Sequence, residues 1–266
     1  MKTVDRFLFY ILCMILISIG HTAASDKTGF QWKIGEELTY KVKWSFIRLG
    51  TLKMSIVDTV QIDGLQLKKV NFYIDSNPMI FFVNMHNVYE SYIDDEIRVH
   101  LFYAEERIDG VLYDTEYRFN YVDRLIHVTM TDMKDTTKTI RKNVPFDVPI
   151  RDGTSMIFYA RNNAHRNHKD TLYSIYEAEV DKVVLNFTGK NEEITLINNE
   201  KIPSHYVDGE LLIKGIAGVT GPYSGWFSTD SQRVPLKAYL KVFIGSVKVE
   251  LESWKNWLGT EYEGGG

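Results

Sequence analysis

The segment from residue 235 to residue 251 constrains the fold most, because its side chains alternate between apolar and polar with the period of a β-strand. Every second residue of its first half is apolar: Leu236, Ala238, Leu240, Val242 and Ile244. The alternation resumes after Gly245-Ser246 with Val247, Val249 and Leu251. Period-two alternation on both sides of a turn signal predicts two long antiparallel strands. A hairpin of this length needs a larger sheet to pair with.

Turn signals divide the rest of the chain into further strands. Asp63-Gly64 is a strong two-residue hairpin signal, and Asp109-Gly110 and Asp123-Arg124 separate later alternating segments. A first strand is expected over residues 38–46, followed by a turn at Leu49-Gly50. The sequence therefore predicts an all-β fold, a large curved antiparallel meander that forms a partly closed barrel or half-barrel. A two-sheet sandwich is the alternative, since sheets beyond about 10 strands tend to curl or split.

One short packed helix is expected near residues 152–164. Asp152 is a suitable N-cap, an interpretation that we prefer to a catalytic acid. Met156, Tyr159 and Ala160 share one face at i, i+3, i+4 spacing. Arg161 falls near the C-terminal end, where a cation complements the helix dipole. Because so short a helix is not stable alone, we expect it to pack on the sheet.

The N-terminal residues 1–24 have the composition of a secretory signal peptide. Lys2 and Arg6 precede the apolar run from Phe7 to Ile19, and small residues follow up to Ala24. The alternative is a membrane anchor, but the run falls short of the roughly 20 residues that span a bilayer. We therefore expect an exported protein of the periplasm or outer envelope, cleaved after about Ala24 and without a transmembrane helix after cleavage.

The organisation expected after cleavage is simple. Residues 25–34 form a flexible leader, residues 35–258 a single β-rich domain, and residues 259–266 a frayed tail. No linker composition interrupts the middle segment.

Composition excludes several classes of function. Cys13 is the only cysteine and lies in the predicted signal peptide, so disulfides, zinc–thiolate sites and cysteine nucleophiles are excluded after cleavage. The chain has 31 basic and 35 acidic side chains, a net charge of −4, and no cluster of four or more Lys or Arg. This mild acidity argues against a nucleic-acid partner. No cofactor is predicted.

The motifs for catalysis and metal binding are weak. His165 and His168 have i, i+3 spacing, but they fall in an apparently solvated loop over residues 165–170, which favours surface histidines over a metal site. No nucleophile elbow and no single pair of carboxylates stands out. We therefore predict that the chain is not an enzyme.

Five residues are candidates for ligand binding: Met79, Phe81, Phe82, Trp226 and Arg233. The apolar segment over residues 79–83 is either an exposed lip that touches lipid or a plug in the core, and we favour the core. Arg233 could bind an anion, although pairing with Asp230 is the simpler interpretation.

Five segments then carry a family pattern, in order along the chain: residues 35–51, 89–94, 151–161, 226–235 and 244–251. They include Gly35-Glu36-Glu37-Leu38, Tyr89-Glu90-Ser91-Tyr92 and Arg151-Asp152, with Tyr159 and Arg161 closing the helix. This arrangement resembles the bacterial exported family called domain of unknown function 3108. The resemblance implies a β-rich protein of the periplasm or envelope whose role is unassigned, and it adds no catalytic residue.

Three hypotheses for function follow. The first is a non-catalytic envelope protein that holds a lipid, glycolipid or other amphipathic ligand in its curved sheet. The second is a structural or protein-interaction module that contacts an envelope protein, and the third is an enzyme acting on polysaccharide. An apolar cavity of about 300 Å³ or more inside the sheet would favour the first over the second.

Overall fold

A single sheet of 15 strands contains most of the regular structure in the computed structural model, which describes residues 29–80, 85–108, 110–212, 220–242 and 245–259. The strands are β1 (Glu37–Trp44), β2 (Ile47–Ile62), β3 (Leu65–Ser76), β4 (His86–Ile93), β5 (Val99–Ile108), β6 (Val111–Asn120), β7 (Leu125–Asp132), β8 (Thr139–Pro145), β9 (Ile150–Arg151), β10 (Asn167–Tyr176), β11 (Glu179–Thr195), β12 (Lys201–Leu211), β13 (Gly221–Ser228), β14 (Pro235–Lys241) and β15 (Ser246–Lys255). Helix α2 (Gly153–Asn163) lies between β9 and β10 in sequence.

The strand order confirms the predicted meander. It runs from β8 back to β1 in sequence order, then from β15 back to β9. The short β9 pairs in parallel with β10, and every other pair is antiparallel. Because β1 pairs with β15, the two edges of the sheet are β8 and β9, which follow one another in the chain. The sheet is therefore strongly curved but not closed by a strand pair.

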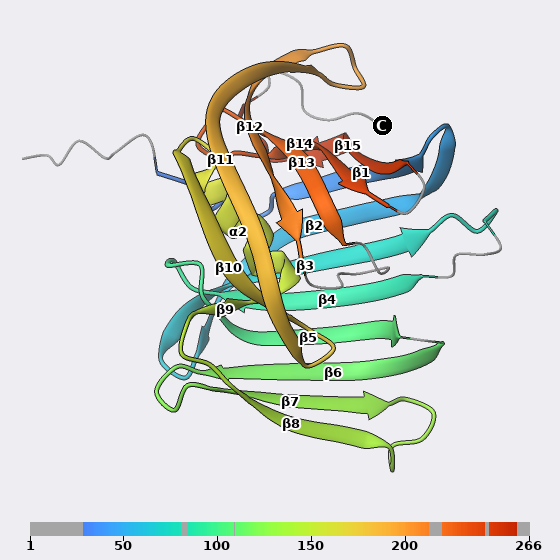
Figure 1. Ribbon diagram of the computed structural model, residues 1–266, viewed down its shortest axis with the longest axis vertical. Coiled ribbons are helices and arrows are strands. Elements are labelled where there is room, and N and C mark those ends of the chain that lie inside the picture. Colours follow the sequence, from blue (N-terminus) through green and yellow to red (C-terminus); the bar gives the residue numbers. More distant parts are fainter. Residues whose placement is uncertain (1–28, 81–84, 109, 213–219, 243–244, 260–266) are drawn as a thin grey trace, which may run out of the picture.

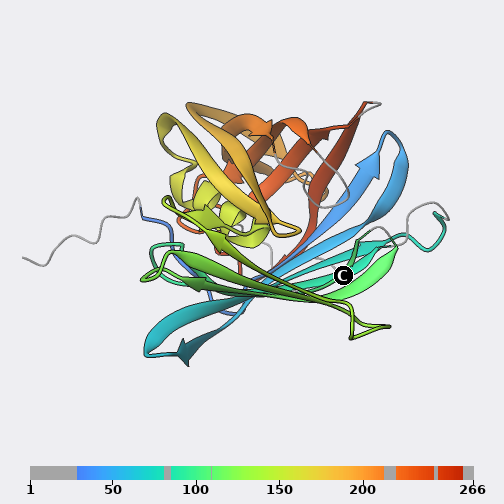
Figure 2. The ribbon, with the colours of Figure 1, turned by 60° about the horizontal axis from the view of Figure 1, so that its bottom comes forward.

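The curved sheet folds into two leaves with the helix between them. We call β1–β8 the N-terminal leaf and β9–β15 the C-terminal leaf. Figures 1 and 2 show the leaves meeting along β1 and β15 and diverging away from that line, with α2 inside the angle. The inner face of each leaf is the one that faces the helix.

The core lies on these inner faces. Leu38 and Tyr40 of β1, Ile56 of β2 and Leu251 of β15 are buried around Phe158 of the helix. The intervening residues of these strands face outward, as the two-residue period requires. Fully burying one such side chain contributes about 1.5 to 3 kcal/mol, so these alternating faces supply most of the stability.

Turn chemistry confirms one predicted turn and corrects another. Asp63 and Gly64 both have positive φ, 50° and 81°, as a two-residue hairpin requires. The predicted turn at Leu49-Gly50 is wrong, because β1 ends at Trp44 and the chain turns at Ser45, whose φ is 54°. Gly50 lies inside β2, where a Cβ would come within 2.3 Å of the Asp75 carbonyl oxygen. The glycine permits close approach of β3.

The helix is confirmed, and its predicted face packs on the C-terminal leaf, where Met156, Tyr159 and Ala160 contact the cluster that includes Phe187. The Asp152 carboxylate accepts a hydrogen bond from the Ser155 backbone N–H at 2.6 Å, so Asp152 is the N-cap. Phe158 and Arg161 are completely buried, whereas Met156 is only partly buried. The helix thus buries a second face that was not predicted, because it contacts both leaves and because Arg161 pairs with Glu36 inside the core.

The predicted polar loop over residues 165–170 is wrong in most of its length. Strand β10 begins at Asn167, and His168 lies opposite Phe187 of β11 with their rings stacked at 4.9 Å. Pairing with β11 overrides the polar composition of this segment. Strand β13 was not predicted either, because Gly221, Pro222 and Gly225 give it the composition of a turn.

Candidate functional site

The inner faces carry a continuous set of apolar side chains that the core only partly covers. Val249 of β15 lies between Val42 of β1 and Ala238 of β14 in the register of the sheet. We define the inner apolar strip as the partly buried residues Val42, Leu52, Ile74, Ala238, Leu240, Val247 and Val249. The strip crosses the line where the two leaves meet, near the end at which β1 turns into β2.

Aromatic side chains cover another part of the inner faces. Trp32 stacks on Phe158 of the helix at 4.5 Å, and Phe30 packs edge-on against both rings. Residues 25–34 were expected to be a flexible leader, but Phe30 and Trp32 pack against the core. This part of the inner face is therefore covered, whereas the inner apolar strip is covered only in part.

A buried ion pair fixes the helix between the leaves. The Arg161 guanidinium donates two hydrogen bonds to the Glu36 carboxylate, both at 2.7 Å, and both side chains are at most 1% exposed. The guanidinium also donates to the Gln232 carbonyl oxygen at 2.7 and 3.0 Å. The Glu36 carboxylate thus balances the charge of the guanidinium, and the N–H donors named above all have acceptors, as a buried arginine requires.

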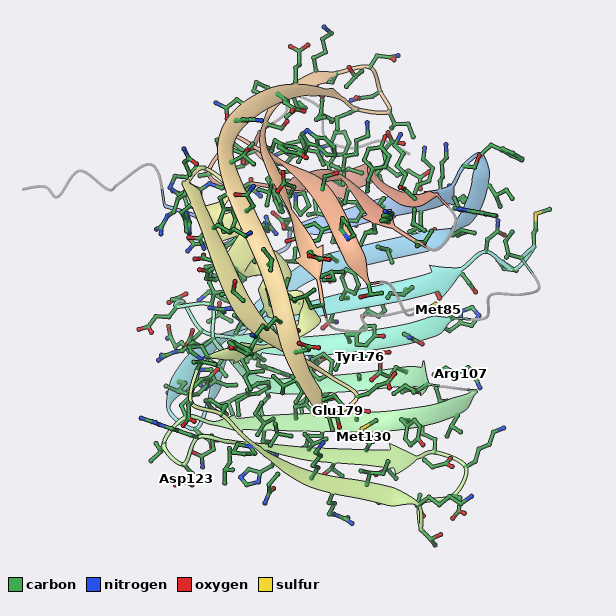
Figure 3. All side chains as sticks on the ribbon, in the orientation of Figure 1. Met85, Arg107, Asp123, Met130, Tyr176 and Glu179 are labelled. Carbon is green, nitrogen blue, oxygen red and sulfur yellow. The ribbon has the colours of Figure 1, made fainter. Side chains whose placement is uncertain are left out.

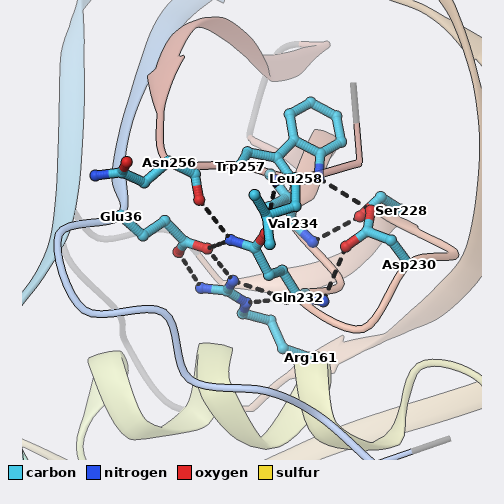
Figure 4. A network of polar contacts seen from close by, with 9 residues as sticks. All are labelled: Glu36, Arg161, Ser228, Asp230, Gln232, Val234, Asn256, Trp257 and Leu258. Atoms are coloured by element: carbon cyan, nitrogen blue, oxygen red, sulfur yellow. Dashed lines mark hydrogen bonds and ion pairs between the residues drawn. The ribbon is translucent and has the colours of Figure 1, made fainter. Parts of the chain in front are cut away.

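Gln232 extends this arrangement to the C-terminal segment. Its side-chain amide donates to Glu36 at 2.9 Å and to the Asn256 carbonyl oxygen at 3.0 Å, and its oxygen accepts from the Leu258 N–H at 2.7 Å. Figure 4 shows these contacts together. We call Glu36, Arg161 and Gln232 the Arg161 network. It joins the start of β1, the helix, the β13–β14 connection and the segment after β15.

A second buried carboxylate lies on the inner face of the N-terminal leaf. Glu106 of β5 is 1% exposed and accepts one hydrogen bond, from the Tyr89 hydroxyl at 3.1 Å. Burial raises the pKa of Glu106 to about 7, and the negative charge of Glu177 adds to that shift. No ion pair to Glu106 is present among the described residues. Asn87, which donates to Tyr89, lies beside Ile74 in the register, so the apolar strip ends at this polar group.

The sequence contained partial signals for both carboxylates. Glu36 and Arg161 each lie in a segment that carries the family pattern, but they are 125 residues apart, so the pairing was not visible. Glu106 occupies the same strand phase as Phe102 and Ala104, which are buried. A carboxylate in an apolar phase is a recognisable signal for a buried charge.

The candidate ligand-binding residues do not come together in the structure. Met79 is 88% exposed after the end of β3, so its interpretation as part of a core plug is wrong. Phe81 and Phe82 lie outside the described residues. The Arg233 side chain is buried and lies 3.3 Å from the Asn162 carbonyl oxygen at the end of the helix.

Trp226 lies on the outer face of the C-terminal leaf. Its ring centroid is 5.2 Å from that of Tyr206 and 5.9 Å from that of Tyr239, and its indole N–H donates to Glu192 at 2.6 Å. Because its register partner is Lys237, one residue from Ala238, Trp226 is on the face opposite the inner apolar strip, although its half-buried ring also packs against the core.

Two hollows on the outer face are bordered mainly by polar residues. One of about 570 Å³ is bordered by Glu37, Thr51, Lys53 and Tyr73, and a neighbouring one of about 390 Å³ by Arg48 and other residues at the end of β3. Neither is an apolar space inside the sheet. In the part of the chain that the structure describes, no three His, Cys, Asp or Glu residues are grouped to hold a metal ion. No helix in that part is long and apolar enough to cross a membrane.

Comparison with known proteins supports the fold and the family. The solved structure of a β-barrel-like protein of domain of unknown function DUF1849 from Brucella abortus has a TM-score of 0.54 and 9% identity, covering 84% of this chain and 98% of that one. A candidate exported protein with a YmcC-like fold from Bacteroides fragilis has a TM-score of 0.39 and 8% identity, covering 86% and 99%. No curated protein matches the chain. Residues 39–252 match the family described as protein of unknown function DUF3108, and the chain belongs to that family.

Proposed function

We propose that this chain is a non-catalytic, exported binding protein that holds the apolar part of an amphipathic ligand, such as a lipid or glycolipid, against the inner apolar strip. The observation that carries the proposal is the partial exposure of Val42, Val249 and Ala238, adjacent apolar residues on three paired strands of the inner face. Inner faces of a sheet are normally covered by core, and a contiguous apolar surface left open favours a ligand. The signal-peptide composition of residues 1–24 supports export.

The inner apolar strip and the polar groups at its end suit a ligand that has an apolar part and a polar part. An acyl chain lying over Leu52 and Ile74 would place its polar end near Asn87 and Glu106, which follow Ile74 on the same inner face. The ordered Arg161 network and the aromatic filling beside it would remain in place, so the ligand adds to the core without replacing it.

The test begins with protein purified from its own envelope fraction. Native mass spectrometry and organic extraction should recover an amphipathic molecule, and the emptied protein should bind a fluorescent fatty acid. Val249→Gln should weaken that binding roughly tenfold, since a polar amide in the strip costs about 1.4 kcal/mol of contact. Lys248→Gln is the matched control, because Lys248 is the adjacent residue on the outward phase of β15. Folded protein that is recovered empty and does not bind the probe would contradict the proposal.

A role in protein interaction is the second candidate. It is supported by the outward-facing group of Tyr206, Trp226 and Tyr239, since aromatic side chains are enriched at protein interfaces. If Trp226→Ala abolishes capture of an envelope protein while Val249→Gln has no effect, this second candidate replaces the first.

A further inference from the structure

The tip of the β10–β11 hairpin lies against the inner face of the opposite leaf. Its turn residues Glu177 and Ala178 have positive φ values of 51° and 59°, although neither is glycine. Ala178 is 5% exposed and packs with Ile175 among residues of the N-terminal leaf that include Tyr117 and Met130. Figure 3 shows Tyr176 and Glu179 at the tip of the hairpin, in front of the N-terminal leaf whose strand β7 carries Met130. The left-handed turn costs free energy that these contacts must offset.

Two side chains of the N-terminal leaf hold the turn in place. The Ala178 backbone N–H donates to the Tyr117 hydroxyl oxygen at 3.3 Å. The Lys142 ammonium donates to the Ala178 carbonyl oxygen at 2.9 Å and to the Glu179 carboxylate at 2.7 Å. Since the strand order ends at β8 on one side and β9 on the other, these contacts connect the leaves where no strand pair does. Releasing the turn breaks side-chain contacts and leaves the sheet intact.

Glu106 belongs to the same contact region. Its hydrogen-bond donor Tyr89 packs in the same buried cluster as Ile175 and Ala178 of the hairpin, and Tyr113 of β6 is the register partner of Glu106. Tyr117, Tyr176 and Glu177 interact with it electrostatically, and the cation at the turn, Lys142, binds Ala178 and Glu179. When Glu106 is ionised, its buried charge has no ion-pair partner among the described residues, and the Glu177 carboxylate adds repulsion. Docking of the turn therefore favours protonated Glu106.

We propose that the β10–β11 turn is a latch between the two leaves that closes when Glu106 is protonated and opens when it is ionised. The burial of Glu106, with one hydrogen bond from a neutral hydroxyl, gives the direction, and its raised pKa agrees with it. Below an ordinary glutamate pKa of about 4.5 the stabilising contribution of protonated Glu106 to the docked turn is complete. It decreases as the pH rises and is lost above about pH 7. Opening of the latch exposes the inner face at the β8 and β9 edges of the sheet. The role of the latch in ligand access rests on the proposed function.

Hydrogen exchange at residues 176–179 tests the latch without any ligand. After correction for intrinsic exchange rates, protection in the wild-type chain should fall at least tenfold between pH 5 and pH 8. Glu106→Gln should keep its protection over that range, since a neutral amide cannot ionise. Glu177→Gln, in the partly exposed turn, should reduce the loss and provides a second variant if the first does not fold. Equal pH dependence in all three proteins would overturn the latch.

A cross-link tests whether the latch controls access. In a Cys13→Ser background, Lys142→Cys and Glu179→Cys can be joined by a short bismaleimide, and uptake of a fluorescent fatty acid should slow at least tenfold. The matched control is Lys201→Cys with Glu193→Cys, the same kind of contact at 2.8 Å but within one leaf. Unchanged uptake in the first cross-linked protein would overturn this route of access. If the wild type takes up no probe, the proposed function is wrong, and the exchange experiment alone decides the latch.

Discussion

Glu36 and Glu106 are both about 1% exposed, yet their surroundings differ completely. Glu36 accepts two hydrogen bonds from Arg161 and one from the Gln232 amide. Glu106 accepts one from a neutral tyrosine hydroxyl. The first carboxylate has a balancing cation, and the second does not. Although both carboxylates are equally buried, the ion pair of Glu36 is expected to be permanent, whereas the contact at Glu106 depends on whether Glu106 is protonated.

The two carboxylates also differ in the segments that they hold together. The Arg161 network joins four segments that are distant in sequence, including the helix and the start of β1 (Figure 4). Glu106 is hydrogen-bonded to Tyr89, which packs in the same buried cluster as a turn that is held by side chains of the N-terminal leaf. We infer that the joint around Arg161 is constant, whereas the contact above Glu106 responds to pH.

Removing the Arg161 cation should have the largest effect on stability. Arg161→Met leaves Glu36 buried without a partner, which should destabilise the fold by about 3 to 5 kcal/mol. For a domain of this size the melting temperature should fall by roughly 10 °C, measured by calorimetry. The double variant Arg161→Met with Glu36→Met should recover much of that loss, because it removes both charges. A double variant as unstable as the single one would show that the ion pair itself is not the cause.

Removing the Glu106 carboxylate should stabilise the protein, which is the opposite of the effect of removing Arg161. Glu106→Gln should stabilise the protein by about 1 to 3 kcal/mol at pH 8, given a pKa of about 7 in the folded chain. The gain should vanish near pH 4, where the wild-type carboxyl is protonated in both states. Urea unfolding at the two pH values measures it, with the exposed neighbour Glu105→Gln as the control. A gain that is independent of pH would contradict the assignment of Glu106 as the titrating group.

The smallest of the three effects concerns the N-cap of α2, at the opposite end of the helix from Arg161. Asp152 accepts hydrogen bonds from the Ser155 N–H at 2.6 Å and from the Ser91 hydroxyl at 2.5 Å. Asp152→Ala should cost about 1 to 2 kcal/mol, the usual value for a lost N-cap. Chemical denaturation would detect this, compared with Asp181→Ala at an exposed position. A loss as large as that of Arg161→Met would mean that the cap, not the ion pair, holds the helix.

The meander and the helix could be predicted because their signals are local. Alternation marks β14 and β15, Asp63-Gly64 marks a turn whose backbone has the required positive φ, and Asp152 marks the start of α2. These signals depend on side chains a few residues apart, and the structure places them as expected.

The rest depends on contacts between distant segments. The pairing of β1 with β15 and the ion pair of Glu36 with Arg161 have no local signature. Gly50 was interpreted as a turn residue because close approach of another strand cannot be distinguished from a turn in one sequence. The candidate site was missed for the same reason, since the inner apolar strip exists only once strands from both ends of the chain lie side by side.

The pairing of β1 with β15 has a consequence for the order of folding. Lys41 and Glu250 are register partners, so this ladder closes a loop of nearly the whole domain. Loop-closure entropy must be overcome before the ladder forms, whereas each hairpin elsewhere forms from sequence neighbours. We therefore expect the two leaves to form first as separate hairpin arrays and to join last along β1 and β15. Until then β1 has an unpaired edge, and during that interval the chain is most exposed to aggregation and proteolysis.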